Sequence, residues 1–293
     1  MNAEILLPAV SAGVAGLLTA VCHRRLRPRA GAWLLAITLT AVVVAVVPAI
    51  VVLVVGYTTH LPWFGGVLAW CRDAFGVHEQ VPTWLGVPGA LMLGAGLLRL
   101  DRVRRSWRRF HCPNSSGLEV VTSADLFAYT LPGAGGQIVV SSALIDRLDE
   151  SELAVVLTHE RVHARHRHDR FVLLGAVAVA VIPALSPLQR RLRFTLERWA
   201  DETVAAELEV ERRQVARTLA SVALSAASVP TAAVGIAGLG VPGRVAALLE
   251  PPMDSRRVGW MGLAAGGVAA VLTAGAVQIH HVWPLLASLC PGW

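Results

Sequence analysis

Long apolar runs alternate with short polar segments in the first third of the chain, and one more such run lies near its end. Each run is close to the roughly 20 apolar residues that a helix needs to cross the hydrocarbon core of a bilayer. The pattern therefore predicts four transmembrane helices, at Ala3–Cys22, Ala32–Tyr57, Trp84–Leu100 and Val258–Val277.

The segment between the third and fourth runs, Asp101–Arg257, has the mixed pattern of a folded domain. Two β-rich runs, Leu118–Thr122 and Gln137–Ser141, are bounded by turns that contain Gly or Pro, and they predict a small sheet. We expect a mainly α membrane protein in three parts: three transmembrane helices in residues 1–100, an α+β domain in 101–257, and a fourth helix with a short tail in 258–293.

The arginines predict how these helices are oriented. All 26 basic side chains are arginine, and 25 of them fall in cytoplasmic segments if the N-terminus lies outside, with only Arg72 on the outer side. The leader Met1–Glu4 is acidic, which indicates a retained anchor rather than a secretory signal. We therefore expect both termini outside the cell and the folded domain in the cytoplasm, against the lipid bilayer.

Composition narrows the class of protein. With 55% apolar and only 16% charged residues, the chain does not have the composition of a soluble globule. The net charge of +6 is explained by the arginines of the predicted cytoplasmic segments, which set the orientation of the helices in the membrane. We therefore expect no direct binding to nucleic acid. Four scattered cysteines without a CxxC pair exclude a cysteine-rich zinc module. Cys71 and Cys290 are both predicted outside, where they form either a disulfide or two unpaired thiols.

The string His159-Glu160-Arg161-Val162-His163 carries the most informative chemistry. It lies on a helix predicted from Glu150 to His168, with Asp149 and Glu152 as a capping box. Histidines four residues apart share a helix face and can bind one zinc ion, while Glu160 takes a proton from the zinc-bound water that attacks a peptide carbonyl. The alternative is a solvated basic face with loose histidines.

The third zinc ligand has two candidates. Asp169 has the spacing used by a second class of zinc peptidases, but His166 stands where that class needs a turn glycine. Glu197 is favoured, because a second predicted helix carries it together with Asp201, which can hydrogen-bond a ligand imidazole. His166 and His168 receive no role and are expected to face solvent.

The apolar run Phe171–Leu188 separates the histidine pair from Glu197. About 12 residues precede Pro183, or roughly 18 Å of helix, which is short of the roughly 30 Å core. We expect this run to dip into the inner leaflet, or lie along it, and return, so that the site faces the cytoplasm. We also expect the strand that contains Gln137, Ile138, Val139 and Val140 to offer an edge to an extended substrate peptide.

These motifs resemble the membrane gluzincin metallopeptidases, both the HtpX and CAAX-prenyl-protease type and the BlaR/MecR type. The resemblance rests on His159-Glu160-x-x-His163 with Glu197-x-x-Ala200-Asp201, on the runs Ala128–Pro132, Gln137–Ile145 and Asp149–Leu153, and on Arg244-Val245-x-x-Leu248-Leu249. It implies a zincin-like domain with one zinc ion. Three helices before the domain and one after it resemble BlaR/MecR more closely, although we expect this chain to lack the outer penicillin-binding domain of those sensors.

Two classes of function follow. The first is an active zinc endopeptidase that cuts a cytoplasmic or membrane-associated protein. The BlaR/MecR resemblance implies a DNA-binding transcriptional repressor as its substrate, and the HtpX resemblance implies damaged membrane proteins. The second class is a non-catalytic membrane receptor or scaffold. The residues His159, Glu160, His163, Glu197 and Asp201 favour the endopeptidase, because a scaffold needs none of them.

Overall fold

The computed structural model describes residues 7–22, 26–58, 82–110, 116–133, 135–227 and 240–251, together with 266, 269 and 273. Three helices come first, at α1 (Leu7–Cys22), α2 (Pro28–Thr58) and α4 (Thr83–Phe110). A three-stranded sheet follows, made of β1 (Leu118–Val121), β2 (Ala128–Thr130) and β3 (Ile138–Ser141). The later helices are α5 (Ser142–Arg147), α6 (Glu150–Arg165), α7 (His168–Val181), α8 (Ser186–Glu207), α9 (Arg212–Ala227) and α10 (Val241–Leu249). The predicted mainly α fold with a small sheet is confirmed.

The sheet has the strand order β1-β3-β2, so β3 lies in the centre. It pairs in parallel with β1 and antiparallel with β2, and its four residues are all buried. The prediction that Gln137, Ile138, Val139 and Val140 offer a free edge is therefore wrong, because both edges of β3 are already hydrogen-bonded within the sheet. Among the described strands, the edge of the sheet on this side is formed by β2, a strand of only three residues.

Helix α6 begins as its sequence predicts. The Asp149 side chain accepts a hydrogen bond from the backbone N–H of Glu152, and the Glu152 carboxylate reaches back to the N–H of Asp149. The helix ends at Arg165 instead of His168, because Arg167 adopts a left-handed conformation with φ 52° and ψ 46°. His168 then begins α7, and the chain changes direction beside the histidine pair.

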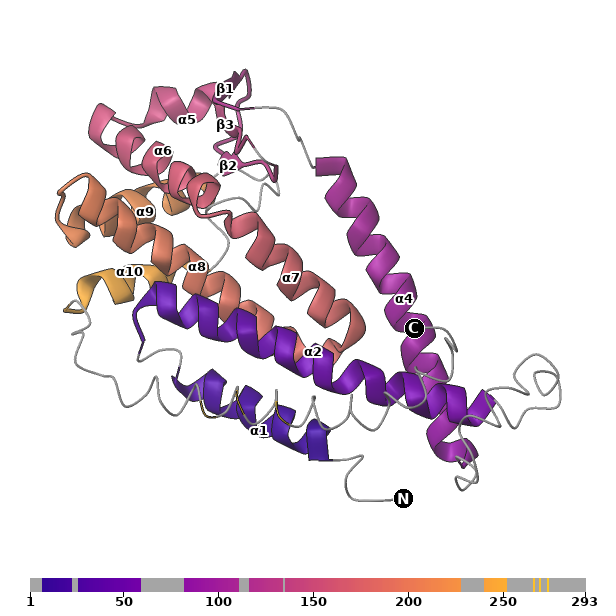
Figure 1. Ribbon diagram of the computed structural model, residues 1–293. Helices are drawn as coiled ribbons and strands as arrows, with labels where there is room; N and C mark the ends of the chain where they lie inside the picture. Colours follow the sequence, from indigo (N-terminus) through magenta and orange to yellow (C-terminus); the bar gives the residue numbers. More distant parts are fainter. Residues whose placement is uncertain are drawn as a thin grey trace, which may run out of the picture.

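Helices α7 and α8 form a hairpin that turns through Pro183–Leu185. The hairpin packs on α2 through a shared hydrophobic core. This core contains Leu35, Leu39 and Val42 of α2, Ile182 at the hairpin turn and Leu192 of α8. The chain turns back at Pro183 and brings α8 alongside α6, whereas the predicted dip into the inner leaflet stays a prediction. Figure 1 shows this hairpin lying between α2 and α4, with the sheet and α6 at its open end.

Two helices in the described part of the chain are long and apolar enough to cross a membrane, Pro28–Thr58 and Thr83–Arg109. The prediction of four such helices is not supported. Within the first run, the described residues Leu7–Cys22 form α1, and these 16 residues span about 24 Å. The run Val258–Val277 lies almost entirely outside the described residues, as do Cys71 and Cys290.

Gly136 fixes the distance between the sheet and α6. Its φ is +58°, and a Cβ placed there would lie 2.6 Å from the Cβ of Ala164 on α6. Only a glycine combines this left-handed backbone with so close an approach. The loop between β2 and β3 is thus pressed against the C-terminal half of the helix that carries both histidines.

Candidate metal centre

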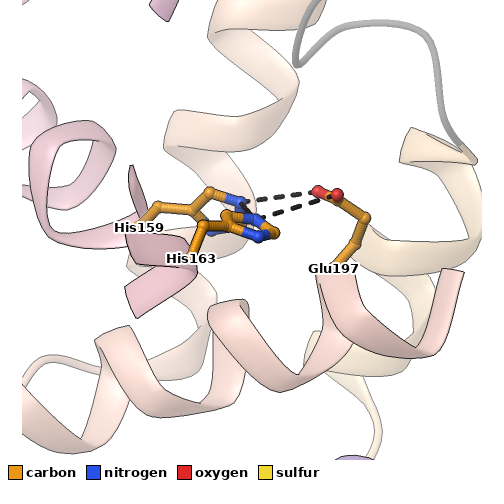
Figure 2. A group of neighbouring side chains, drawn as sticks. All are labelled: His159, His163 and Glu197. Carbon is orange, nitrogen blue, oxygen red and sulfur yellow. Dashed lines mark hydrogen bonds and ion pairs between the residues drawn. The ribbon is translucent and has the colours of Figure 1, made fainter. Parts of the chain in front are cut away.

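His159 and His163 on α6 meet Glu197 on α8 (Figure 2). The Nε2 atoms of the two histidines lie 3.1 Å apart. Glu197 Oε2 is 3.4 Å from His159 Nε2, and Glu197 Oε1 is 3.8 Å from His163 Nε2. One ligand atom from each residue falls within 4.8 Å of the others. The structure thus brings the three predicted ligands together.

These separations fit a small tetrahedral cation. Zinc binds histidine nitrogen at about 2.0–2.1 Å, so two ligand atoms on a tetrahedral zinc ion lie about 3.3 Å apart. The three observed distances of 3.1, 3.4 and 3.8 Å bracket that value. Two imidazoles and one carboxylate are also a donor set that zinc accepts in catalytic sites, where a fourth position stays open. The residues present therefore fit zinc.

The Nε2 atom of His159 faces Glu197, and the other ring nitrogen, Nδ1, faces Asp201. Asp201 lies one helical turn after Glu197 on α8. His159 Nδ1 lies 3.2 Å from Asp201 Oδ1, as the sequence predicted for this carboxylate. Asp201 is itself held by Arg244 of α10, whose Nε and Nη2 donate to Oδ2 and Oδ1 at 2.9 and 2.6 Å. Arg244 Nη1 also lies 2.9 Å from Glu197 Oε2. One buried guanidinium thus joins two carboxylates of the site.

These contacts control the charges in the buried site. Burial alone works to lower the pKa of His159, but the hydrogen bonds to Asp201 and Glu197 outweigh it and raise the pKa to about 9. Burial works to raise the pKa of Asp201, yet its hydrogen bonds to Arg244 and His159 hold it below its usual range. For Glu197, the nearby charge of His163, with His159 and Arg244, outweighs burial and lowers the pKa. Both carboxylates are therefore ionised.

His163 is oriented by a different kind of partner. Its Nδ1 lies 2.8 Å from Nδ1 of His168, which starts α7. His168 is buried, with 2% of its surface exposed, so the prediction that it faces solvent is wrong. The reason is the left-handed turn at Arg167, which folds the start of α7 back over α6. Burial lowers the pKa of both rings, and neutral His168 can accept the Nδ1–H of His163.

Glu160 is buried in the wall of a cavity of about 310 Å³ that also contains the candidate ligands. The Thr130 hydroxyl of β2 lies 2.8 Å from Glu160 Oε2 and 2.9 Å from the backbone oxygen of Glu160. This contact holds the carboxylate beside the edge strand. Ala128 and Tyr129 of β2 line the same cavity as Glu160.

The two remaining sequence candidates lie at the margin of the site. Asp169 lines the cavity, but its Oδ1 pairs with Arg167 Nε at 3.3 Å, and it is not in the group of three ligands. His166 is half-buried, and its ring packs on Trp199 with centroids 4.8 Å apart. Among the described residues, neither side chain has a contact that assigns it a part in metal binding.

Sequence reasoning assigned no role in this site to three residues that contact it. Thr130 lies on a strand too short for an alternating pattern, and His168 was assigned to the wrong helix. Arg244 is 43 residues from Asp201, and only its place in a short motif singled it out. His168 had no such signal, because on the predicted unbroken helix it would lie nine residues from His159, on the opposite face.

Comparison with known proteins agrees with this geometry. Residues 100–236 match the model of peptidase family M48, which includes the HtpX and CAAX-protease types. The match covers a little under half of the chain and contains the three candidate ligands, Glu160 and Asp201, whereas Arg244 lies beyond it. This part of the chain is similar to zinc metallopeptidases. No curated protein and no solved structure gave a match.

Proposed function

We propose that this protein is a zinc-dependent endopeptidase of the membrane surface, with His159, His163 and Glu197 as zinc ligands. The observation that carries the proposal is the convergence of these three side chains from α6 and α8 at distances suited to one tetrahedral ion. A non-catalytic receptor or scaffold has no need of such a group, nor of a buried Glu160 in the same cavity. The match to family M48 supports the same class of enzyme.

In this mechanism, bound zinc supplies a Lewis acid that polarises the peptide carbonyl and lowers the pKa of water toward 7. The remaining steps belong to the side chains. Glu160 takes a proton from the attacking water and passes it to the leaving amine. Asp201 holds the His159 ring so that Nε2 points inward, and His168 does the same for His163. Thr130 keeps the Glu160 carboxylate beside the substrate.

The outer edge of β2 is the place where we propose that substrate binds. In the hairpin with β3, the N–H of Leu131 donates to Gln137 and the carbonyl of Phe127 accepts from Ser141. Because successive residues of a strand face opposite sides, the backbone groups of Ala128 and Thr130 point away from β3. An extended peptide can pair with these groups as a fourth strand.

We further propose that the catalytic domain lies on the cytoplasmic side of the membrane. The arginine-bearing ends of α2 and α4 both lie next to the candidate site. Arg29 at the start of α2 stacks over Trp199 of α8 at 5.7 Å, and Trp107 near the end of α4 lines the catalytic cavity. The other ends of α2 and α4 extend away from the domain and meet there (Figure 1). This arrangement suits arginine-rich ends that remain in the cytoplasm.

The substrate is a cytoplasmic or membrane-associated protein. The resemblance to BlaR/MecR favours a transcriptional repressor, and the resemblance to HtpX favours damaged membrane proteins. These candidates are separated by comparing, in cells, the proteins that accumulate uncut when the Glu160→Gln variant replaces the active chain. Accumulation of one DNA-binding protein supports the repressor, and accumulation of many misassembled membrane proteins supports quality control.

Zinc content tests the central proposal. We expect the purified full chain to contain about one zinc ion, and Glu197→Ala to lose most of it, because two imidazoles alone bind zinc weakly. The measurement is elemental analysis after dialysis. His166→Ala, which removes a neighbouring histidine outside the ligand group, is the matched control and should keep the metal. A chain that cuts its substrate equally well after complete metal removal would refute the proposal.

His168 gives a second test in the same site. Outer hydrogen-bond partners of ligand histidines typically change metal affinity about 10–100-fold when they are lost, so we expect His168→Leu to weaken zinc binding by that factor. His168→Asn retains a hydrogen-bond acceptor and should recover part of the loss. Affinity is measured by competition with a chromogenic chelator, with His166→Leu as control. Equal affinity in His168→Leu and the unaltered chain would show that His168 does not orient His163.

A further inference from the structure

A groove separate from the catalytic cavity lies between α4 and the hairpin of α7 and α8. Its volume is about 350 Å³. Ala176 and Val179 of α7 and Pro183 at the hairpin turn form an apolar wall, and Arg99 and Arg102 of α4 form the opposite wall. The groove therefore combines an apolar surface with two guanidinium groups. Such a groove is complementary to an amphiphilic anion, a molecule with an apolar part and a negatively charged group.

The two arginines carry charge that no carboxylate neutralises within the described part of the chain. Arg99 and Arg102 are exposed, and the ion pair nearby joins Arg105 to Asp101 at 2.5 Å instead. Residues 99 and 102 are three apart on a helix and so project from the same side. An anion between them would meet both guanidinium groups without displacing an existing partner.

The groove also lies where α4 changes from apolar to basic. Gly96 packs against the hairpin tip, since a Cβ at this position would lie 3.7 Å from Val181 Cα. Leu97 and Leu98 follow and expose 61% and 64% of their surfaces, and Arg99 comes directly after them. If α4 crosses the bilayer, exposed leucines belong in hydrocarbon and exposed arginines at the phosphate level. That boundary falls at the groove.

We propose that this groove binds one anionic phospholipid of the inner leaflet, with its phosphate between Arg99 and Arg102 and an acyl chain along Leu98 and the α7 wall. The proposal rests on the membrane location proposed above and is independent of catalysis. A lipid held there contacts α4 and the hairpin together, and so ties the membrane helix to the domain that carries Glu197.

Native mass spectrometry of the full chain in detergent, titrated with phosphatidylglycerol or phosphatidylcholine, tests the site. We expect one phosphatidylglycerol to bind in preference to phosphatidylcholine. Arg99→Gln with Arg102→Gln should weaken this binding roughly 30-fold, which is about fivefold for each charge removed. Arg104→Gln with Arg108→Gln removes the same charge from exposed positions of α4 outside the groove lining, and should have a much smaller effect. Ala176→Leu narrows the groove without changing charge and should also weaken binding.

Other results would overturn the proposal. Equal losses in the two arginine pairs would indicate diffuse attraction without a built site, and unchanged binding in Ala176→Leu would exclude the groove. Displacement of the lipid by inorganic phosphate alone would show an anion site without lipid selectivity. Membrane flotation tests the membrane location separately. A chain recovered in the soluble fraction refutes both the membrane location and this site. A membrane-bound chain without lipid preference refutes only the site.

Discussion

Replacing Glu160 with Gln should lower the rate of peptide cleavage by a factor of roughly 10² to 10⁴, the usual contribution of a positioned general base. The amide has nearly the same shape as the carboxylate, and its oxygen can still accept the hydrogen bond from Thr130. Packing around the buried side chain is therefore preserved, but the group no longer takes a proton from water. Zinc content should stay near that of the unaltered chain, since Glu160 is not among the three ligands.

The cleavage assay needs a control that separates chemistry from position. Thr130→Val removes the hydroxyl that holds Glu160 but leaves the base itself, so we expect a smaller loss of rate than in Glu160→Gln. Both variants are compared at equal zinc loading and with the same peptide substrate. Unchanged cleavage by Glu160→Gln with zinc bound would remove Glu160 from its role and leave the metal site without its proposed base.

The part of the site that depends on local patterns was predictable from sequence. The capping box at Asp149 fixes where α6 begins, and the four-residue spacing then places His159 and His163 on one face. Pro183 ends the apolar run early enough for α8 to return and carry Glu197 back to them. Each of these steps involves residues close together in the chain.

Features set by the tertiary structure were not predictable in the same way. The three residues of β2 are too few to show alternation, so β3 was assigned the free edge that belongs to its neighbour. The helical pattern runs through residues 166–168 without a break, yet Arg167 adopts a left-handed conformation that buries His168. No pattern in the sequence indicates a positive φ at an arginine, since the surrounding contacts decide it.

The number of membrane helices shows a related limit. A window of apolar residues does not distinguish a helix that crosses a bilayer from one that packs against other helices. The first half of α2 illustrates this, because Leu35 and Leu39 are fully buried against the hairpin. Hydropathy measures how apolar a segment is, whereas its neighbours decide whether that surface meets lipid or protein.

Arg244→Met should destabilise the protein more than any other single change in the site. Arg244 exposes 1% of its surface and pairs with Asp201 and Glu197. Its removal therefore leaves the buried Asp201 carboxylate and the partly buried Glu197 carboxylate short of a partner. Breaking a buried ion pair from one side costs about 3–5 kcal/mol, and the unfolding midpoint should fall by roughly 10 °C. Thermal unfolding is measured with zinc removed, so that lost metal binding does not add to the effect.

A double-variant cycle distinguishes a lost ion pair from lost packing. Asp201→Asn removes one of the charges left unpaired, so Arg244→Met with Asp201→Asn should cost less than the sum of the two single changes. Arg217→Met replaces an exposed arginine of α9 and should change the midpoint little. Additive losses in the cycle would mean that Arg244 stabilises α10 by packing alone, and that the carboxylates next to His159 do not depend on it for their charge.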